Sequence, residues 1–112
     1  MLHCMTLSAA VTFDFDYTDA NHFDDTSKAS LASAASMISG WFNHTATISI
    51  AVTDSNANTS ILASAGSSYA NAFAAGEFTD RGVVGAKILN NGATDPNGAT
   101  ADGSVNVNFF HN

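Results

Sequence analysis

The chain opens with an alternation of apolar and polar side chains that is typical of a half-exposed β-strand. Over residues 11–17 every second side chain is apolar, and Thr12, Asp14 and Asp16 fill the positions between. Successive side chains of a strand point to opposite faces, so the pattern predicts one buried and one polar face. Asp14 and Asp16, with Asp19 nearby, then form an acidic cluster on the outer face, for which exposure to solvent is sufficient explanation.

A repeat of three and four residues follows and predicts an amphipathic helix over about residues 26–42. Its apolar stripe consists of Leu31, Ala34, Ala35, Ile38, Trp41 and Phe42. Asp24, Asp25 or Thr26 can cap the start, because a side-chain oxygen there accepts the first free helical N–H groups. Gly40 weakens the last turn.

Three further apolar segments predict strands. Residues 45–53 and 105–109 alternate, whereas residues 83–89 are β-branched and apolar on both sides, which is consistent with a covered strand. A shorter helix is expected from Ser67 or Ser68 to a stop at Gly76.

Strand, helix and strand in succession predict a βαβ unit with parallel strands. The expected fold class is α+β, with about four strands in one mixed twisted sheet, one long helix and one shorter helix. Residues 11–112 would form a single domain that is incomplete. Residues 1–10 would be either the remnant of a secretory signal or a disordered N-terminus.

The composition limits the partners. In 112 residues, 46% hydrophobic side chains supply one core, while 3 basic against 10 acidic residues give a net charge of -7. Displacing counterions from nucleic acid needs many cationic side chains, and anionic membranes need the same, so both partners are excluded. A single cysteine, Cys4, excludes an internal disulfide and any multi-cysteine metal site.

The loop of residues 91–103 is the candidate ion site. Asp95, Asn97 and Asp102 lie among glycines, and calcium prefers six to eight oxygen ligands of this kind. The spacing does not match an EF-hand, and the alternative is a turn built from residues that tolerate tight backbone angles.

Catalytic motifs are missing from the sequence. The histidines His3, His22, His44 and His111 include no pair four residues apart, as a zinc-binding helix requires. The serines lie in no nucleophile elbow. No catalytic residue and no zinc ligand is therefore assigned.

The pattern as a whole resembles a known family. Phe13-Asp-Phe-Asp-Tyr17, a helix closing on Trp41-Phe42 and the strand of residues 45–53 resemble the opening of secreted bacterial zincin-type metalloproteases. The later segment of residues 84–109, with Asp95-Pro-Asn-Gly98, is similar to the region just before the zinc helix of these enzymes.

The resemblance implies a hydrolase of which this chain is only a part. In that family a His-Glu-x-x-His helix holds zinc, and its glutamate is the general base. Here Glu77 has no histidine three residues later, and only Asn112 follows His111. The chain is therefore expected to be inactive and secreted, while its full-length relative would use zinc to cleave peptide or protein substrates.

The resemblance also implies that an edge strand of the sheet pairs with extended peptide, at residues 83–89 or 105–109. A second hypothesis rests on the acidic balance and the loop of residues 91–103. It is a calcium-stabilised extracellular adhesion or surface-binding module without enzymatic activity.

Overall fold

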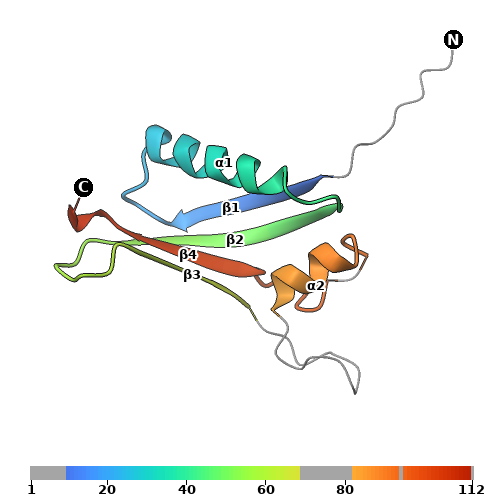
Figure 1. The fold of residues 1–112 in the computed structure, drawn as a ribbon. Helices are drawn as coiled ribbons and strands as arrows, with labels where there is room; N and C mark the ends of the chain where they lie inside the picture. The colour runs from blue at the N-terminus through green and yellow to red at the C-terminus, as the bar shows by residue number, and fades with distance from the viewer. Residues whose placement is uncertain (1–9, 69–81, 94, 112) are drawn as a thin grey trace, which may run out of the picture.

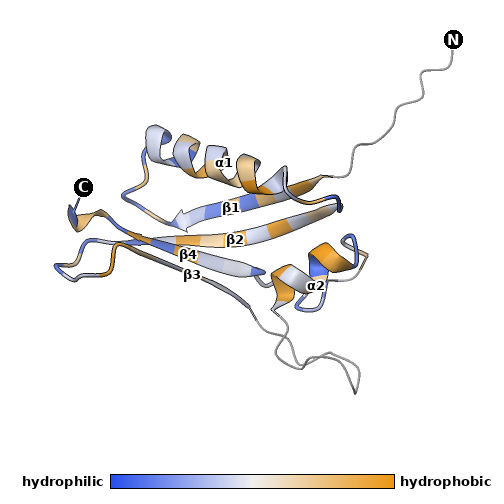
Figure 2. Ribbon diagram, in the orientation of Figure 1, coloured by the Kyte–Doolittle hydropathy of each residue, from blue (hydrophilic) through white to orange (hydrophobic). Residues whose placement is uncertain are grey.

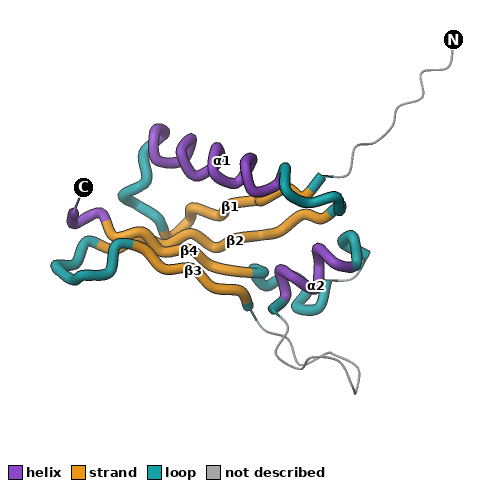
Figure 3. Tube along the Cα trace, viewed as in Figure 1, coloured by secondary structure: helices purple, strands orange, loops and turns teal. Residues whose placement is uncertain are grey.

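The computed structural model describes residues 10–68, 82–93 and 95–111. The elements in chain order are β1 (Val11–Asp19), α1 (Asp25–Ser39), β2 (Ala46–Ser55), β3 (Ala63–Ser67), α2 (Val83–Leu89), β4 (Gly103–Asn108) and the short 3-10 helix η1 (Phe109–His111). The four strands form one open sheet in the order β1-β2-β4-β3 (Figures 1 and 3). β1, β2 and β4 are parallel and β3 is antiparallel to β4, so the predicted α+β fold with a mixed sheet is confirmed.

The predicted strand–helix–strand unit is present. β1 pairs with β2 in parallel, with Val11 opposite Ala46. Asp24 caps α1, because its Oδ1 accepts a hydrogen bond from the backbone N–H of Ser27 at 2.7 Å. The helix ends at Ser39, before the predicted end at about residue 42, and Gly40 is its C-cap residue.

The core lies on one face of the sheet. Val11, Ile48 and Val52 are at most 1% exposed, and α2 adds Ile88 to the same cluster. α1 lies over β1, and the apolar colouring of β2 in Figure 2 marks the strand at the centre of this core. The opposite face carries hydroxyl, amide and carboxylate side chains, which are those of Thr12, Asp14, Asp16, Thr47, Thr53, Ser104 and Asn106.

The prediction of a strand at residues 83–89 is wrong, because this segment is α2. Val83, Ala86, Lys87 and Ile88 are buried, while Gly85 is exposed. Val83, Ala86 and Lys87 have the three- and four-residue spacing of one helix face. A short apolar run does not by itself distinguish a buried strand from a buried helix. Most of the shorter helix expected before Gly76 lies outside the described residues.

The sequence did not predict β3. Its residues, Ala63–Ser67, are small and include a glycine, so their own preference for a strand is weak. β3 forms because β4 pairs with it along its whole length, from Ala63 opposite Val107 to Ser67 opposite Gly103.

The sheet order also corrects the expected edge strand. β4 corresponds to the predicted strand at residues 105–109, but it lies between β2 and β3 and has no free edge. Since residues 83–89 are helical, both proposed edge positions are wrong. The edge strands of the described sheet are β1 and β3. Neither described helix is long and apolar enough to cross a membrane.

Candidate functional site

The hydrogen bonds at the two ends of β3 show which of its backbone groups are used. Asn108 donates its backbone N–H to the carbonyl of Leu62 at 2.8 Å, and Ser68 donates to the carbonyl of Asp102 at 2.7 Å. In an antiparallel pair, hydrogen-bonded and non-hydrogen-bonded residue pairs alternate along the strand. Leu62 and Ser68 therefore fix the phase of the whole ladder.

This phase leaves a free edge on the outer side of β3. Ser64 and Gly66 direct their backbone groups towards β4, whereas Ala63 and Ala65 direct theirs away from it. Ala63 and Ala65 are exposed, and among the described residues no strand lies beyond β3. The strand contains no charged side chain and no proline, the features that usually block such an edge.

Asn108 holds the connection that leads into β3. Its Oδ1 accepts from the backbone N–H groups of Ala57 and Phe110, both at 3.1 Å. Its Nδ2 donates to the carbonyls of Ala57 at 2.8 Å and Ile61 at 2.9 Å. Asn108 is 7% exposed, so this buried amide fixes the position of the loop between β2 and β3.

The structure brings two of the three candidate calcium ligands to one ammonium group. The Nζ of Lys87 lies 2.8 Å from Oδ2 of Asp102 and 3.4 Å from Oδ2 of Asp95. The side chain of Asp102 is completely buried, and its Oδ2 also accepts from the backbone N–H of Ser49 at 2.8 Å. Asp102 thereby links α2, β2 and the start of β4.

The third candidate, Asn97, is close to the same junction. Its Nδ2 donates to the carbonyl of Ala101 at 2.9 Å, which neighbours Asp102. The Oδ1 atoms of Asn97 and Asp102 are buried without a hydrogen-bond partner. Both atoms are acceptors, so only a donor or a cation would satisfy them.

The charge of Lys87 is maintained in this position. Burial lowers its pKa, but the hydrogen bond and charge of Asp102 and the charge of Asp95 outweigh this effect and raise the pKa above its ordinary value. Two carboxylates of the loop of residues 91–103 thus already face a cation, the ammonium group of Lys87 on α2. Within the described ranges no three His, Cys, Asp or Glu side chains are grouped as a metal site, and calcium stays a prediction.

His22 and His111 make separate, structural contacts, whereas Nδ1 of His44, the third described histidine, is buried without a hydrogen-bond partner. Nδ1 of His22 lies 2.8 Å from Oδ1 of Asp54, and Nε2 of His111 lies 2.6 Å from the carbonyl of Thr59. Burial raises the pKa of Asp54, but the hydrogen bonds and charge of His22 outweigh this effect and lower it. His3 lies outside the described residues, so no zinc ligand is assigned.

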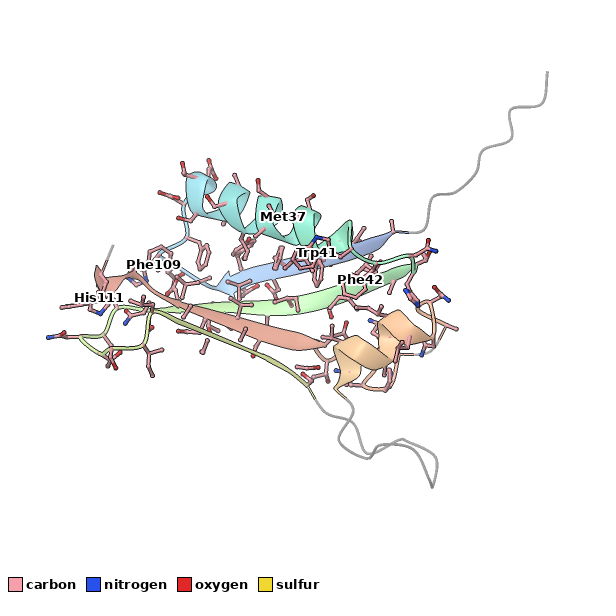
Figure 4. The ribbon with its side chains drawn as sticks, viewed as in Figure 1. Met37, Trp41, Phe42, Phe109 and His111 are labelled. Carbon is pink, nitrogen blue, oxygen red and sulfur yellow. The ribbon has the colours of Figure 1, made fainter. Side chains whose placement is uncertain are left out.

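An apolar groove follows the inner side of α1. One part is lined only by apolar residues, which are Phe13, Phe15, Leu31, Ala34, Ala35, Ile38, Ile50 and Val105. A cavity of about 560 Å³ continues it past Leu62, Phe109 and His111. Figure 4 shows Phe109 and His111 at the end of the sheet away from Met37 and Trp41, which are 67% and 73% exposed. Phe13, Phe15 and Val105, which line the groove, are only partly buried, so α1 covers only part of the apolar surface.

Three features of the site were missed from the sequence: the edge of β3, the amide of Asn108 and the ammonium of Lys87. Lys87 did carry a signal, because it is one of only 3 basic residues in the chain. A rare lysine next to a loop with two aspartates is a candidate ion-pair partner. No protein-family model, curated protein or solved structure matches the chain.

Proposed function

We propose that the chain is the N-terminal sheet subdomain of a secreted zinc-dependent metallopeptidase, in which the free edge of β3 binds extended peptide substrate. The zinc and its His-Glu-x-x-His helix would belong to the full-length relative, so the chain by itself is inactive. The observation that carries the proposal is the uncharged, antiparallel edge strand with outward N–H and C=O groups at Ala63 and Ala65.

An extended peptide can extend a sheet by pairing with such groups, and main-chain hydrogen bonds then supply affinity without a strict sequence requirement. This suits a peptidase, which must hold many sequences in one extended conformation. The methyl side chains of Ala63 and Ala65 leave space for the side chains of a peptide.

The groove beside α1 is a second supporting feature. A zinc-binding helix in the full-length relative would need an apolar surface against which to pack. Leu31 and Ile38 of α1, with Ile50 and Val105 of the sheet, offer a surface without polar side chains. An amphipathic helix in this groove would bury apolar area that is partly exposed in the present chain.

A substitution that removes one backbone N–H group tests whether the edge of β3 binds peptide. Ala65→Pro removes the outward N–H of Ala65 and leaves the hydrogen bonds of Ser64 and Gly66 to β4 in place. The matched control Ala65→Val keeps the N–H and adds a residue that favours strands. We expect titration with an extended peptide library to shift the NMR amide signals of Ala63 and Ala65, and we expect Ala65→Pro to abolish this binding.

A proline variant in which peptides shift the Ala63 signal as strongly as they do in Ala65→Val would contradict this use of β3. The enzyme class is tested separately, by reading the coding sequence beyond Asn112. We expect a His-Glu-x-x-His motif, and a longer product that holds one zinc ion and cleaves peptides. One tightly held zinc per molecule in the present chain would contradict the proposal.

The calcium-stabilised binding module is the second candidate, and the two unpartnered oxygens of Asn97 and Asp102 favour it. A ligand that binds only the folded state raises its stability. A thermal melt in calcium and in chelator separates the candidates, because an unchanged Tm would eliminate the calcium-dependent module.

A further inference from the structure

The second edge of the sheet, on β1, is also open. Ala46 donates its backbone N–H to the carbonyl of Ala10 at 3.1 Å, which fixes the phase of the parallel pair. Alternate residues of β1 therefore bond to β2, and these include the residues with polar side chains. Val11, Phe13 and Phe15 direct their N–H and C=O groups to the open side, where the described residues provide no neighbouring strand.

A groove of about 400 Å³ runs beside this edge. Ala32, Ala35, Ser36 and Ser39 of α1 line it, together with Val11, Phe13 and Phe15 of β1. Figure 1 shows α1 directly over β1, so a strand added to this edge would place alternate side chains below the outer side of the helix. The small residues of α1 leave room there for small apolar side chains.

The other face of the same edge is acidic. Asp14 and Asp16 are exposed on β1. The hydroxyl and the backbone N–H of Thr18 donate to Asp16, which lowers the pKa of its carboxyl group below the ordinary value. Neither lysine of the described ranges neutralises this pair, since Lys28 lies 5.0 Å from the ring centre of Tyr17 and Lys87 bonds to Asp102.

We propose that the β1 edge binds an extended segment of a partner protein in which small apolar residues alternate with lysine or arginine. The apolar side chains would enter the groove below α1, and the basic ones would lie beside Asp14 and Asp16. The unpaired backbone groups supply the pairing, and the charges select the partner. This site is on the opposite edge from β3 and does not depend on the peptidase proposal.

A second copy of the chain does not fit this site. Pairing β1 with β1 would bring the acidic residues of both copies together, and like charges on adjacent strands are destabilising. The chain also has only 3 basic residues against 10 acidic ones. The partner is therefore a different protein with a basic strand.

The test uses the intact chain, labelled with ¹⁵N, and three synthetic peptides of equal length in which valine alternates with lysine, serine or glutamate. We expect the lysine peptide to shift the amide signals of Val11, Phe13 and Phe15 and to slow their hydrogen exchange. Its affinity should fall as salt is added, since exposed charges are screened. The glutamate peptide should leave the amide signals of Val11, Phe13 and Phe15 unchanged.

The variant Asp14→Asn should weaken the lysine peptide by about threefold, which is the usual size of one exposed ion pair. Asp25→Asn is the matched control, because it removes the same charge from an exposed position at the start of α1. Equal weakening by both variants would reduce the effect to net charge and overturn the proposal. Equal shifts of the Val11, Phe13 and Phe15 signals by the lysine and glutamate peptides, or signal changes confined to Ala63 and Ala65, would also overturn it.

Discussion

Replacing Lys87 with methionine isolates the buried ion pair. The substitution Lys87→Met keeps an unbranched apolar stem in the same space and removes the ammonium group. The side chain of Asp102, which is 0% exposed, then keeps the donors of Ser49 but loses the charge 2.8 Å away. The perturbation leaves an uncompensated carboxylate in the interior of the protein.

Removing one partner of a buried pair costs about 3–5 kcal/mol. The free energy of unfolding of a small domain is about 5–15 kcal/mol in total, so the variant would lose a large part of it. With a urea dependence of about 2 kcal/mol per molar for a domain of this size, the unfolding midpoint should fall by about 2 M.

The assay is urea unfolding followed by far-UV circular dichroism at neutral pH. Lys28→Met is the control, because it removes the same charge from a lysine that lies over the ring of Tyr17 and should cost about 0.5–1 kcal/mol. In the double variant of Lys87→Met with Asp102→Asn, the loss should be smaller than the sum of the two single losses. Additive losses, or equal midpoints for Lys87→Met and Lys28→Met, would refute the ion pair as a stabilising contact.

Three further predictions concern other contacts. The lowered pKa of Asp54 contributes stability above its unfolded value of about 3.8, and this stability is lost as the pH falls through the lowered value. The variant Asp54→Asn should therefore be less stable than the unmodified chain at neutral pH and should lose less stability on acidification. Urea melts across this pH range would show both effects. Asn108→Ala should lower the free energy of unfolding by about 3 kcal/mol, since four hydrogen bonds of a buried amide disappear; a loss below about 1 kcal/mol in the same melts would contradict this. Gly103→Ala should cost about 1–3 kcal/mol, because its added Cβ would lie 2.8 Å from the carbonyl oxygen of Gly66, and an unchanged thermal melt would contradict the tight contact.

The first half of the fold could be predicted because its periods are clear. In β1, α1 and β2 the apolar positions repeat over enough residues to distinguish a period of two residues from a period of 3.6 residues. The segment of residues 83–89 shows no such period, and the helix that it forms packs against β2. β3 could not be predicted from the sequence for a different reason, since its Ala and Ser residues form a strand only where β4 supplies hydrogen bonds.

The candidate site was predicted in part. The sequence identified Asp95 and Asp102 as a pair of loop carboxylates, and the structure does place both at one cation. It could not identify that cation as Lys87, because the expected strand would have directed this side chain differently. The contact of His22 with Asp54 joins residues 32 positions apart, and no local pattern reports such a distance.

The place of β4 between β2 and β3 determines when the edge of β3 can exist. β3 has β4 as its pairing partner, yet Gly103–Asn108 is synthesised about forty residues after Ala63–Ser67, and pairing of such distant segments is slow. A growing chain can form the parallel pair of β1 and β2 early and must wait for β4 before residues 63–67 become a strand. The surface proposed to hold substrate would therefore be assembled last, so a partly made chain would not offer it to other polypeptides during synthesis.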